Sequence, residues 1–126
     1  MVESDLIRQC LLGAVALVFL LLALRAALQP DAIAREVGLT PTGANGYSEL
    51  HAIYLGLWAM HGVLGVYALL HVEQAILGDA LALLLLGQPL GRLWALPRHG
   101  WPQGPLRVFF ALEIVGALAL LLVRPG

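Results

Sequence analysis

The sequence contains no lysine, one cysteine and few charges of either sign. Only 12% of its 126 residues are charged and 60% are hydrophobic, whereas soluble domains average about 25% charged and about 45–50% apolar. The single cysteine, Cys10, excludes an intramolecular disulfide and a cysteine metal cluster, and we expect it to be buried as a small apolar side chain. A net charge of −1 provides no basic patch for nucleic acid. Length and composition together indicate one integral-membrane domain, residues 1–126.

Long apolar runs predict four transmembrane helices, because a bilayer core requires about 20 apolar residues of helix. The expected spans are residues 6–28, 48–70, 74–96 and 106–123. The third is the weakest, with Asp79 and Arg92 near its ends, and a re-entrant segment is the alternative there. The first run is longer than a signal-peptide core and follows Glu3 and Asp5, so we expect a span rather than a cleaved leader. The predicted fold class is all-α, an antiparallel up-down four-helix transmembrane bundle.

The connecting segments have distinct signals. "PDAIAREVGL" (30–39) predicts a short surface helix with Asp31 as its cap and Gly38 as its stop. "PRHGWPQGP" (97–105) should join the last two spans as a loop that no helix would tolerate. Pro89, inside the third span, is expected to kink it and free a carbonyl. Glu73 and Asp79, at the start of that span, are expected to be exposed.

Arginine placement predicts the orientation. Four spans put both termini on one face of the membrane, and that face holds Arg8 and Arg124. The opposite face holds the other five arginines, which are Arg25, Arg35, Arg92, Arg98 and Arg107. Because arginine is enriched in cytoplasmic loops, we expect the long loops to be cytoplasmic and both termini to lie outside.

Glu113 is the most informative polar residue within the spans. An ionisable group at the bilayer centre costs about 2.5–3.5 kcal/mol and therefore normally faces the protein interior with a partner. Glu113 and Arg92 approach the same end of their spans to a similar depth, so we expect an ion pair between them. Gln88, one helical turn from Arg92, would join it. The alternative is a purely structural pair that fixes the helix register.

The second span carries a stripe of aromatic and hydrogen-bonding residues. Its 4-3-4-3-4 spacing places on one helix face Tyr47, His51, Tyr54, Trp58, His61 and Gly65. We expect that face to point to the bundle centre, although His51 and Tyr54 bonding only to backbone is the alternative. Glu49 lies on the opposite side and is expected to cap the helix start.

No cofactor or metal is expected. His61 lies at mid-membrane, but no other span contains a histidine that could be a second axial ligand for haem. His51 is about 15 Å away along the same helix and cannot share one iron with His61.

Three short motifs resemble one bacterial family. They are "ELHAIYLG" (49–56), "GRLWALPRHGWP" (91–102) and "LEIVGALAL" (112–120), and they are similar to signatures of the small four-span membrane proteins called domain of unknown function 4345, which in turn resemble the DoxX-like group. The resemblance places on family positions Glu49, Tyr54, Gly56, Gly91, Arg92, Gly100 and Glu113. The family's Arg is His51 here, its first Gly of a pair is Leu55, and its Asn is Ser48. The lost arginine changes the charge of the polar cluster, and the family implies a bacterial inner membrane but no activity.

We therefore hypothesise a bacterial inner-membrane protein that binds a small lipophilic molecule at a polar pocket near the cytoplasmic end of the bundle. The candidate ligand-binding residues are Glu49, His51, Tyr54, Gln88, Arg92 and Glu113, with Arg92 as the anchor for a polar head. One alternative is an integral-membrane isomerase or cyclase with Glu113 as its general acid. Another is an accessory subunit or homo-oligomer, whose helix contacts would use small residues on an outward face, namely Gly62, Gly65, Gly116 and Ala117.

Overall fold

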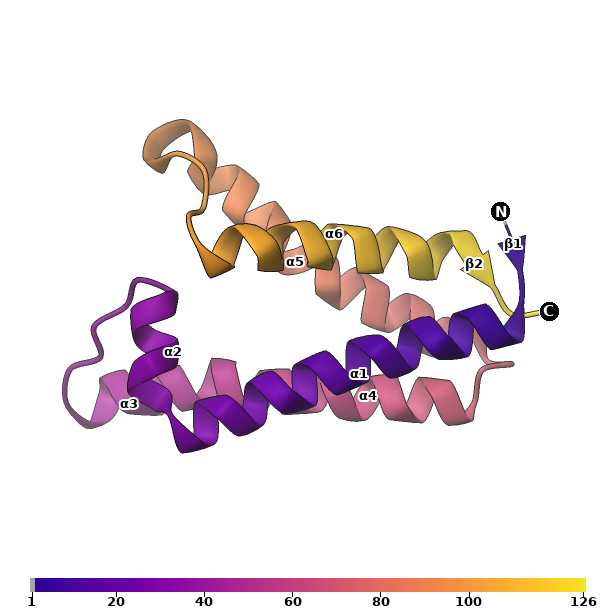
Figure 1. Ribbon diagram of the computed structural model, residues 1–126, viewed down its shortest axis with the longest axis horizontal. Helices are drawn as coiled ribbons and strands as arrows, with labels where there is room; N and C mark the ends of the chain where they lie inside the picture. The colour runs from indigo at the N-terminus through magenta and orange to yellow at the C-terminus, as the bar shows by residue number, and fades with distance from the viewer. Residues whose placement is uncertain (1) are drawn as a thin grey trace.

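The computed structural model describes residues 2–126 as a helical membrane protein with a small pair of strands joining its ends (Figure 1). Four helical stretches are long and apolar enough to cross a membrane, so the predicted all-α fold and multi-pass character are confirmed. The helices are α1 (Asp5–Leu28), α2 (Pro30–Glu36), α3 (Gly43–His51), the π-helix η1 (Ala52–Leu57), α4 (Trp58–Leu70), α5 (Ala75–His99) and α6 (Pro105–Leu122). The strands are β1 (Val2–Glu3) and β2 (Val123–Arg124).

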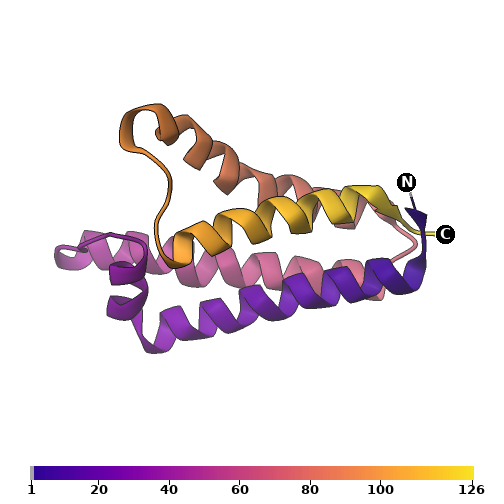
Figure 2. The ribbon, with the colours of Figure 1, turned by 45° about the horizontal axis from the view of Figure 1, so that its top comes forward.

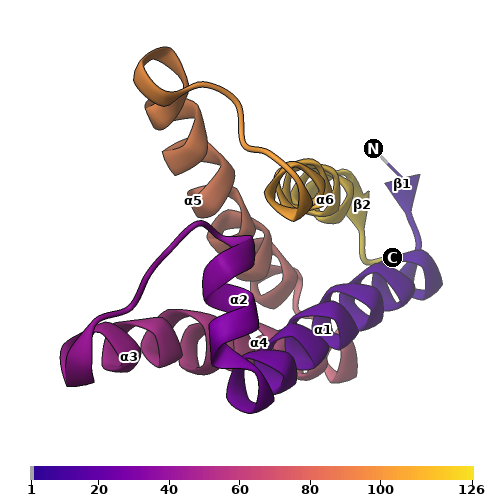
Figure 3. The ribbon, with the colours of Figure 1, turned by 60° about the vertical axis from the view of Figure 1, so that its left-hand side comes forward.

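The long helices form two pairs. α1 packs along α4 and α5 packs along α6, while contacts of α4 with α5 connect the pairs. Figures 1 and 2 show the chain passing back and forth along the long axis, with both termini at the same end. Toward its C-terminal end, α5 leans away from α1 and α4 (Figure 3). The bundle is therefore tighter at the end that holds the termini.

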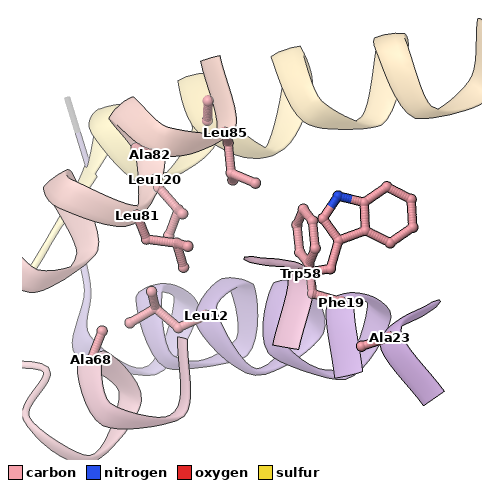
Figure 4. Packing of buried hydrophobic residues seen from close by; sticks show 10 residues of the cluster. Leu12, Phe19, Ala23, Trp58, Ala68, Leu81, Ala82, Leu85 and Leu120 are labelled. Atoms are coloured by element: carbon pink, nitrogen blue, oxygen red, sulfur yellow. The ribbon is translucent and has the colours of Figure 1, made fainter. Parts of the chain in front are cut away.

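Small and branched apolar residues fill the region where the helices meet. Leu12 of α1, Leu81 of α5 and Leu120 of α6 are fully buried there (Figure 4). The glycines Gly62 and Gly65 of α4 are also buried, directly against Leu20 and Ala16 of α1, where an added Cβ would lie 2.5 Å and 2.9 Å from the nearest atom. The expectation that these glycines form an outward face is wrong, because they allow α1 and α4 to approach each other closely. Ala117, predicted with them, is 0% exposed.

A polar cluster joins the two ends of the chain, and we name Arg8, Asp79 and Arg124 the terminal clasp. The Arg8 guanidinium is 1% exposed. It donates to Leu120 O (2.5 Å) and Val123 O (2.7 Å) at the end of α6 and to Asp79 Oδ1 (3.2 Å) of α5. The last carbonyls of a helix have no partner within it, so Arg8 supplies donors that the end of α6 lacks.

The terminal clasp corrects the expectation that Asp79 is exposed. Both Asp79 oxygens accept hydrogen bonds from Arg124, and one of them also accepts from Arg8. The backbone adds a second connection, since β1 pairs in parallel with β2, in a register that places Val2 opposite Val123. Cys10, expected to be buried, is instead exposed on the outer surface of α1.

The short surface helix forms as α2, but its cap differs from the prediction. Pro30 occupies the first turn and makes Gln29 the capping residue, because proline lacks the N–H that a cap would satisfy. Asp31 instead accepts a 2.8 Å hydrogen bond from the Tyr47 hydroxyl. Gly38, with a φ of 75°, follows the helix in the left-handed conformation that ends many helices, as the sequence predicted.

Two helix boundaries differ from the sequence prediction. α5 continues through Pro97 to His99, because a proline in the last turn forfeits only one hydrogen bond at the helix end. Gly100, with a φ of 84°, then ends it. The second long helix begins at Gly43 rather than near Ser48, so Glu49 lies in its second turn and does not cap it.

Candidate functional site

The expected ion pair between α5 and α6 is present. Arg92 Nη1 donates to Glu113 Oε1 at 2.5 Å, and Arg92 Nη2 donates to Gln88 Oε1 at 3.1 Å. Gln88 and Arg92 lie one turn apart on α5, so their side chains are neighbours. The hydrogen bond to Gln88 therefore helps to orient the Arg92 guanidinium toward Glu113 on α6. Glu113 is buried and Arg92 is partly buried. Because Arg92 is bonded to both Gln88 and Glu113, its guanidinium is fixed and holds the Glu113 carboxyl in one orientation.

The same carboxyl has a free side. Glu113 Oε2 is buried and has no hydrogen-bond partner among residues 2–126. The indole nitrogen of Trp58 on α4 is likewise buried without a partner in that part of the chain. Buried polar groups are hydrogen-bonded in the large majority of cases, so each exception requires a reason.

Both unpartnered groups belong to residues that line one cavity of about 220 Å³. Its wall is formed by α1, α4, α5 and α6 and is almost entirely apolar. The polar side chains on the wall are those of Gln88 and Glu113, with the indole of Trp58. The remaining lining residues are Leu11, Ala14, Val15, Val18, Phe19, Leu22, Leu85, Phe109, Leu112, Val115 and Gly116.

Aromatic rings hold Trp58 in place. Edge-to-face contacts bring the centroids of Tyr54, Phe19 and Phe109 to 4.9, 6.0 and 6.2 Å from that of Trp58, within the range that stabilises aromatic pairs. Figure 4 shows Trp58 beside Phe19, with the indole nitrogen on the side of the ring toward Leu85. The ring orientation is thus fixed by its neighbours rather than by a bond to its nitrogen.

One side of the cavity is open. Val18 on α1 and Leu112 and Val115 on α6 contribute to its wall, yet they are 44%, 56% and 64% exposed. These residues lie well within helices that are apolar enough to cross a membrane. Their exposed surfaces therefore face the hydrocarbon of the bilayer, and the cavity opens toward lipid between α1 and α6.

The sequence model of one family, described as Domain of unknown function (DUF4345), matches residues 7–124. The chain belongs to the DUF4345 family. No curated protein and no solved structure matches it. The family match covers all four helices that line the cavity, and it agrees with the resemblance that the short motifs indicated.

In this DUF4345 protein the predicted site residues fall into two groups. Gln88, Arg92 and Glu113 lie together. Glu49 and Tyr54 line a separate hollow of about 180 Å³ beside the loop after α2, with Thr40 and Leu50 among its other residues. The single polar cluster expected from the sequence is therefore divided between two hollows, and Tyr54, whose ring packs on Trp58 of the first cavity, lies between them.

The π-helix η1 explains the division. His51 precedes it, and its Nδ1 donates to Tyr47 O at 2.7 Å, the backbone contact that was the alternative for this residue. A π-helix inserts an extra residue in the turn, so residues after it are rotated relative to those before it. Trp58, His61 and Gly65 consequently face the interior, whereas Tyr47 is 38% exposed.

His61 is accounted for by packing. Its Nδ1 donates to Leu57 O at 2.7 Å and its ring stacks on Phe19 with the centroids 5.0 Å apart. Within residues 2–126, no group of three or more His, Cys, Asp or Glu side chains is placed to hold a metal ion. Sequence reasoning overlooked Trp58 as a polar group of the site, and the available signal was its place in the same stripe, three residues before His61.

Proposed function

We propose that this DUF4345 protein is a small bacterial inner-membrane protein that binds a lipophilic molecule in the cavity between its helices. The carrying observation is that two residues lining the cavity, Glu113 and Trp58, each bury a polar atom without a partner, Oε2 and the indole N–H. Leaving such a group unpaired costs about 1–3 kcal/mol. A ligand with a polar end would recover this cost, and its apolar part would suit the remaining wall.

The proposed roles follow the cavity wall. Glu113, Trp58 and Gln88 contact the ligand. Arg92, which the sequence suggested as the anchor, does not line the cavity, and we assign it the role of positioning Glu113 through their ion pair. Tyr54 supports the Trp58 ring, while Glu49 and His51 lie outside this wall.

The two rival functions have less support. A general acid is best free of a cationic partner, and Glu113 is bonded to Arg92. For an accessory subunit, the small residues expected on the outside are mostly packed within the chain. Lipid binding therefore uses more of the observed features than either rival.

A cavity-filling variant tests the proposal. Gly116 lines the cavity, and a Cβ there would meet only ordinary contacts, at 3.8 Å from Val15 and 3.9 Å from Leu85. Gly116→Val should therefore occupy the cavity with little strain on the backbone. Gly87→Val is the matched control, because Gly87 is also helical and no atom lies within 4 Å of its added Cβ.

The measurement is native mass spectrometry with extraction of bound lipid from gently purified protein. We expect a discrete small molecule on the wild type and on Gly87→Val, and its loss from Gly116→Val. The proposal is wrong if all three proteins carry only bulk phospholipid or if the filled variant retains the same molecule. A second protein bound at fixed stoichiometry to every variant would instead favour the accessory subunit.

A further inference from the structure

We infer that the ligand is a single-chain lipid whose polar end is a neutral hydroxyl, and that it reaches the cavity from the bilayer between α1 and α6. This inference rests on the proposed function and adds the chemical class of the ligand. Its observations are the charge balance at Glu113, the two unpartnered groups and the open side of the cavity.

Charge balance argues for a neutral head. The Glu113 carboxyl is already paired with the Arg92 guanidinium at 2.5 Å, and among residues 2–126 no other charged side chain lines the cavity. A cationic or anionic head would therefore bring a charge without a counter-charge into an apolar, buried space. Burying an unpaired charge costs far more than burying a hydrogen-bonded neutral group.

The hydrogen-bonding groups argue for a hydroxyl. The indole N–H can only donate, and a carboxylate oxygen can only accept. A ligand that satisfies both must accept from Trp58 and donate to Glu113 Oε2. A hydroxyl group can both accept and donate, whereas an ester or ketone only accepts and a hydrocarbon does neither.

The size and the open side argue for one hydrocarbon chain. The volume of about 220 Å³ is below the roughly 300–1,000 Å³ of sites that enclose drug-sized ligands. The cavity therefore holds the head and the first part of a chain. The rest of the chain would leave past Val18, Leu112 and Val115, which are exposed to lipid.

Trp58 itself supplies the assay. The chain has three tryptophans, and the other two, Trp94 and Trp101, are 84% and 56% exposed. Replacing both by phenylalanine leaves Trp58 as the single emitter. The full-length protein is reconstituted in phosphatidylcholine nanodiscs and titrated with hexadecanol, hexadecane, hexadecanoate and hexadecylamine, with each of the last two in its ionised form.

We expect a saturable change in Trp58 emission with hexadecanol and about tenfold or more weaker binding of the other three, the factor that one hydrogen bond supplies. Equal binding of hexadecane would overturn the polar contacts. Tightest binding of hexadecanoate or hexadecylamine would overturn the neutral head. In either case a discrete molecule lost from Gly116→Val would still support the cavity, so the two proposals fail separately.

Glu113→Gln tests whether Glu113 sets the selectivity for the polar end of the ligand, because a residue with a purely structural role would not change the order in which the probes bind. The amide retains an acceptor oxygen but leaves Arg92 without its counter-charge. The preference should therefore move from hexadecanol toward hexadecanoate by about tenfold, while Glu73→Gln, a surface change of the same type, leaves it unchanged. An unchanged order of the four probes in a folded Glu113→Gln protein would contradict the charge argument.

Discussion

Single residues in this protein combine burial with hydrogen bonding to the backbone, and Arg8 is the clearest example. Its guanidinium contacts carbonyls at the end of α6 and the start of α5, including Ala75 O at 2.9 Å. Gly78 permits this, because an added Cβ would lie 2.4 Å from the Arg8 guanidinium. One side chain from the first helix thus orders the ends of two others.

Removing Arg8 should consequently destabilise the fold. We expect Arg8→Met to reduce the free energy of unfolding by about 3–5 kcal/mol, because the carbonyls of Leu120, Val123 and Ala75 lose their donor, at about 1–3 kcal/mol for each that stays buried. The measurement is the thermal unfolding of detergent-solubilised protein. Arg35→Met is the matched control, because Arg35 is exposed on α2 and its replacement should change little. Equal melting temperatures for Arg8→Met and the wild type would exclude a structural role for the terminal clasp.

At the other end of α1, Glu36 provides a pH-dependent contact. Its carboxyl accepts hydrogen bonds from both terminal nitrogens of Arg25, one of them at 2.7 Å. This hydrogen bonding holds the pKa of Glu36 below its usual value of 4.5, against the opposing effect of burial. A carboxyl with a lowered pKa stabilises the folded state above its ordinary pKa, and that stabilisation is lost as the pH falls through the lowered value.

The wild type should therefore melt at a higher temperature than Glu36→Gln at neutral pH, and the difference should vanish as the pH falls below the usual carboxyl range. Both proteins are melted across the same pH series, so that titration of other carboxyls cancels in the difference. Glu3→Gln, a change of the same type at an exposed residue of β1, is the matched control. A difference that grew on acidification would contradict the expected sign.

At the scale of elements, η1 is the feature that most affects the site. π-helical turns are commonly single extra residues within an α-helix. Deleting Gly56, which is exposed within η1, should restore regular α-helix while the side chains on either side keep their places. Met60 is exposed within α4, which is a regular α-helix without an extra residue. Deleting it should therefore rotate the part of the helix before residue 60 by about 100° relative to the part after it.

We expect the Gly56 deletion to accumulate in membranes as a monodisperse protein and to retain the Trp58 response, whereas the Met60 deletion loses both. The measurements are membrane yield, size-exclusion profile and the hexadecanol titration. If both deletion variants behaved alike, the extra residue would not be specific to η1.

The helices and their ion pairs show how much of the structure could be predicted from the sequence. The helices follow from hydropathy, and the Arg92–Glu113 pair follows from matching depths in adjacent spans. The pairing of Arg8 with Asp79 follows the same rule, since each lies within a turn or so of a helix start, and depth matching between those spans would have found it. The π-helix could not be predicted, because hydrophobic spacing alone does not reveal an extra residue in a turn. The lack of a hydrogen-bond partner for the Trp58 indole nitrogen could not be predicted either, because it depends on how α1, α5 and α6 pack around that side chain.

At the scale of the whole molecule, the bundle has two unlike ends. One end holds the termini, and its arginines Arg8 and Arg124 are both bonded to Asp79. The other end carries the exposed arginines Arg35, Arg98 and Arg107. The positive charge available for orientation is therefore concentrated at the loop end, which supports our proposal that the loops are cytoplasmic and the termini outside.

Fusions to alkaline phosphatase and green fluorescent protein would measure this orientation in bacterial cells. A C-terminal fusion should give phosphatase activity and no fluorescence, because the phosphatase is active only outside the cytoplasm. The same partners inserted after Gln103 should give the reverse. The opposite pattern at both positions would show that the arginine bias does not set the topology.

Charge variants connect that orientation to its cause. Replacing Arg35 and Arg98 together by glutamine removes two exposed charges from the loop end without touching the ion pairs of Arg92 or Arg25. We expect part of the population to invert, seen as fluorescence of the C-terminal green fluorescent protein fusion. Glu3→Gln with Glu73→Gln is the matched control, because acidic residues contribute little to topology. Since the terminal arginines are held by Asp79, we propose that the exposed loop-end arginines set the direction in which this bundle inserts.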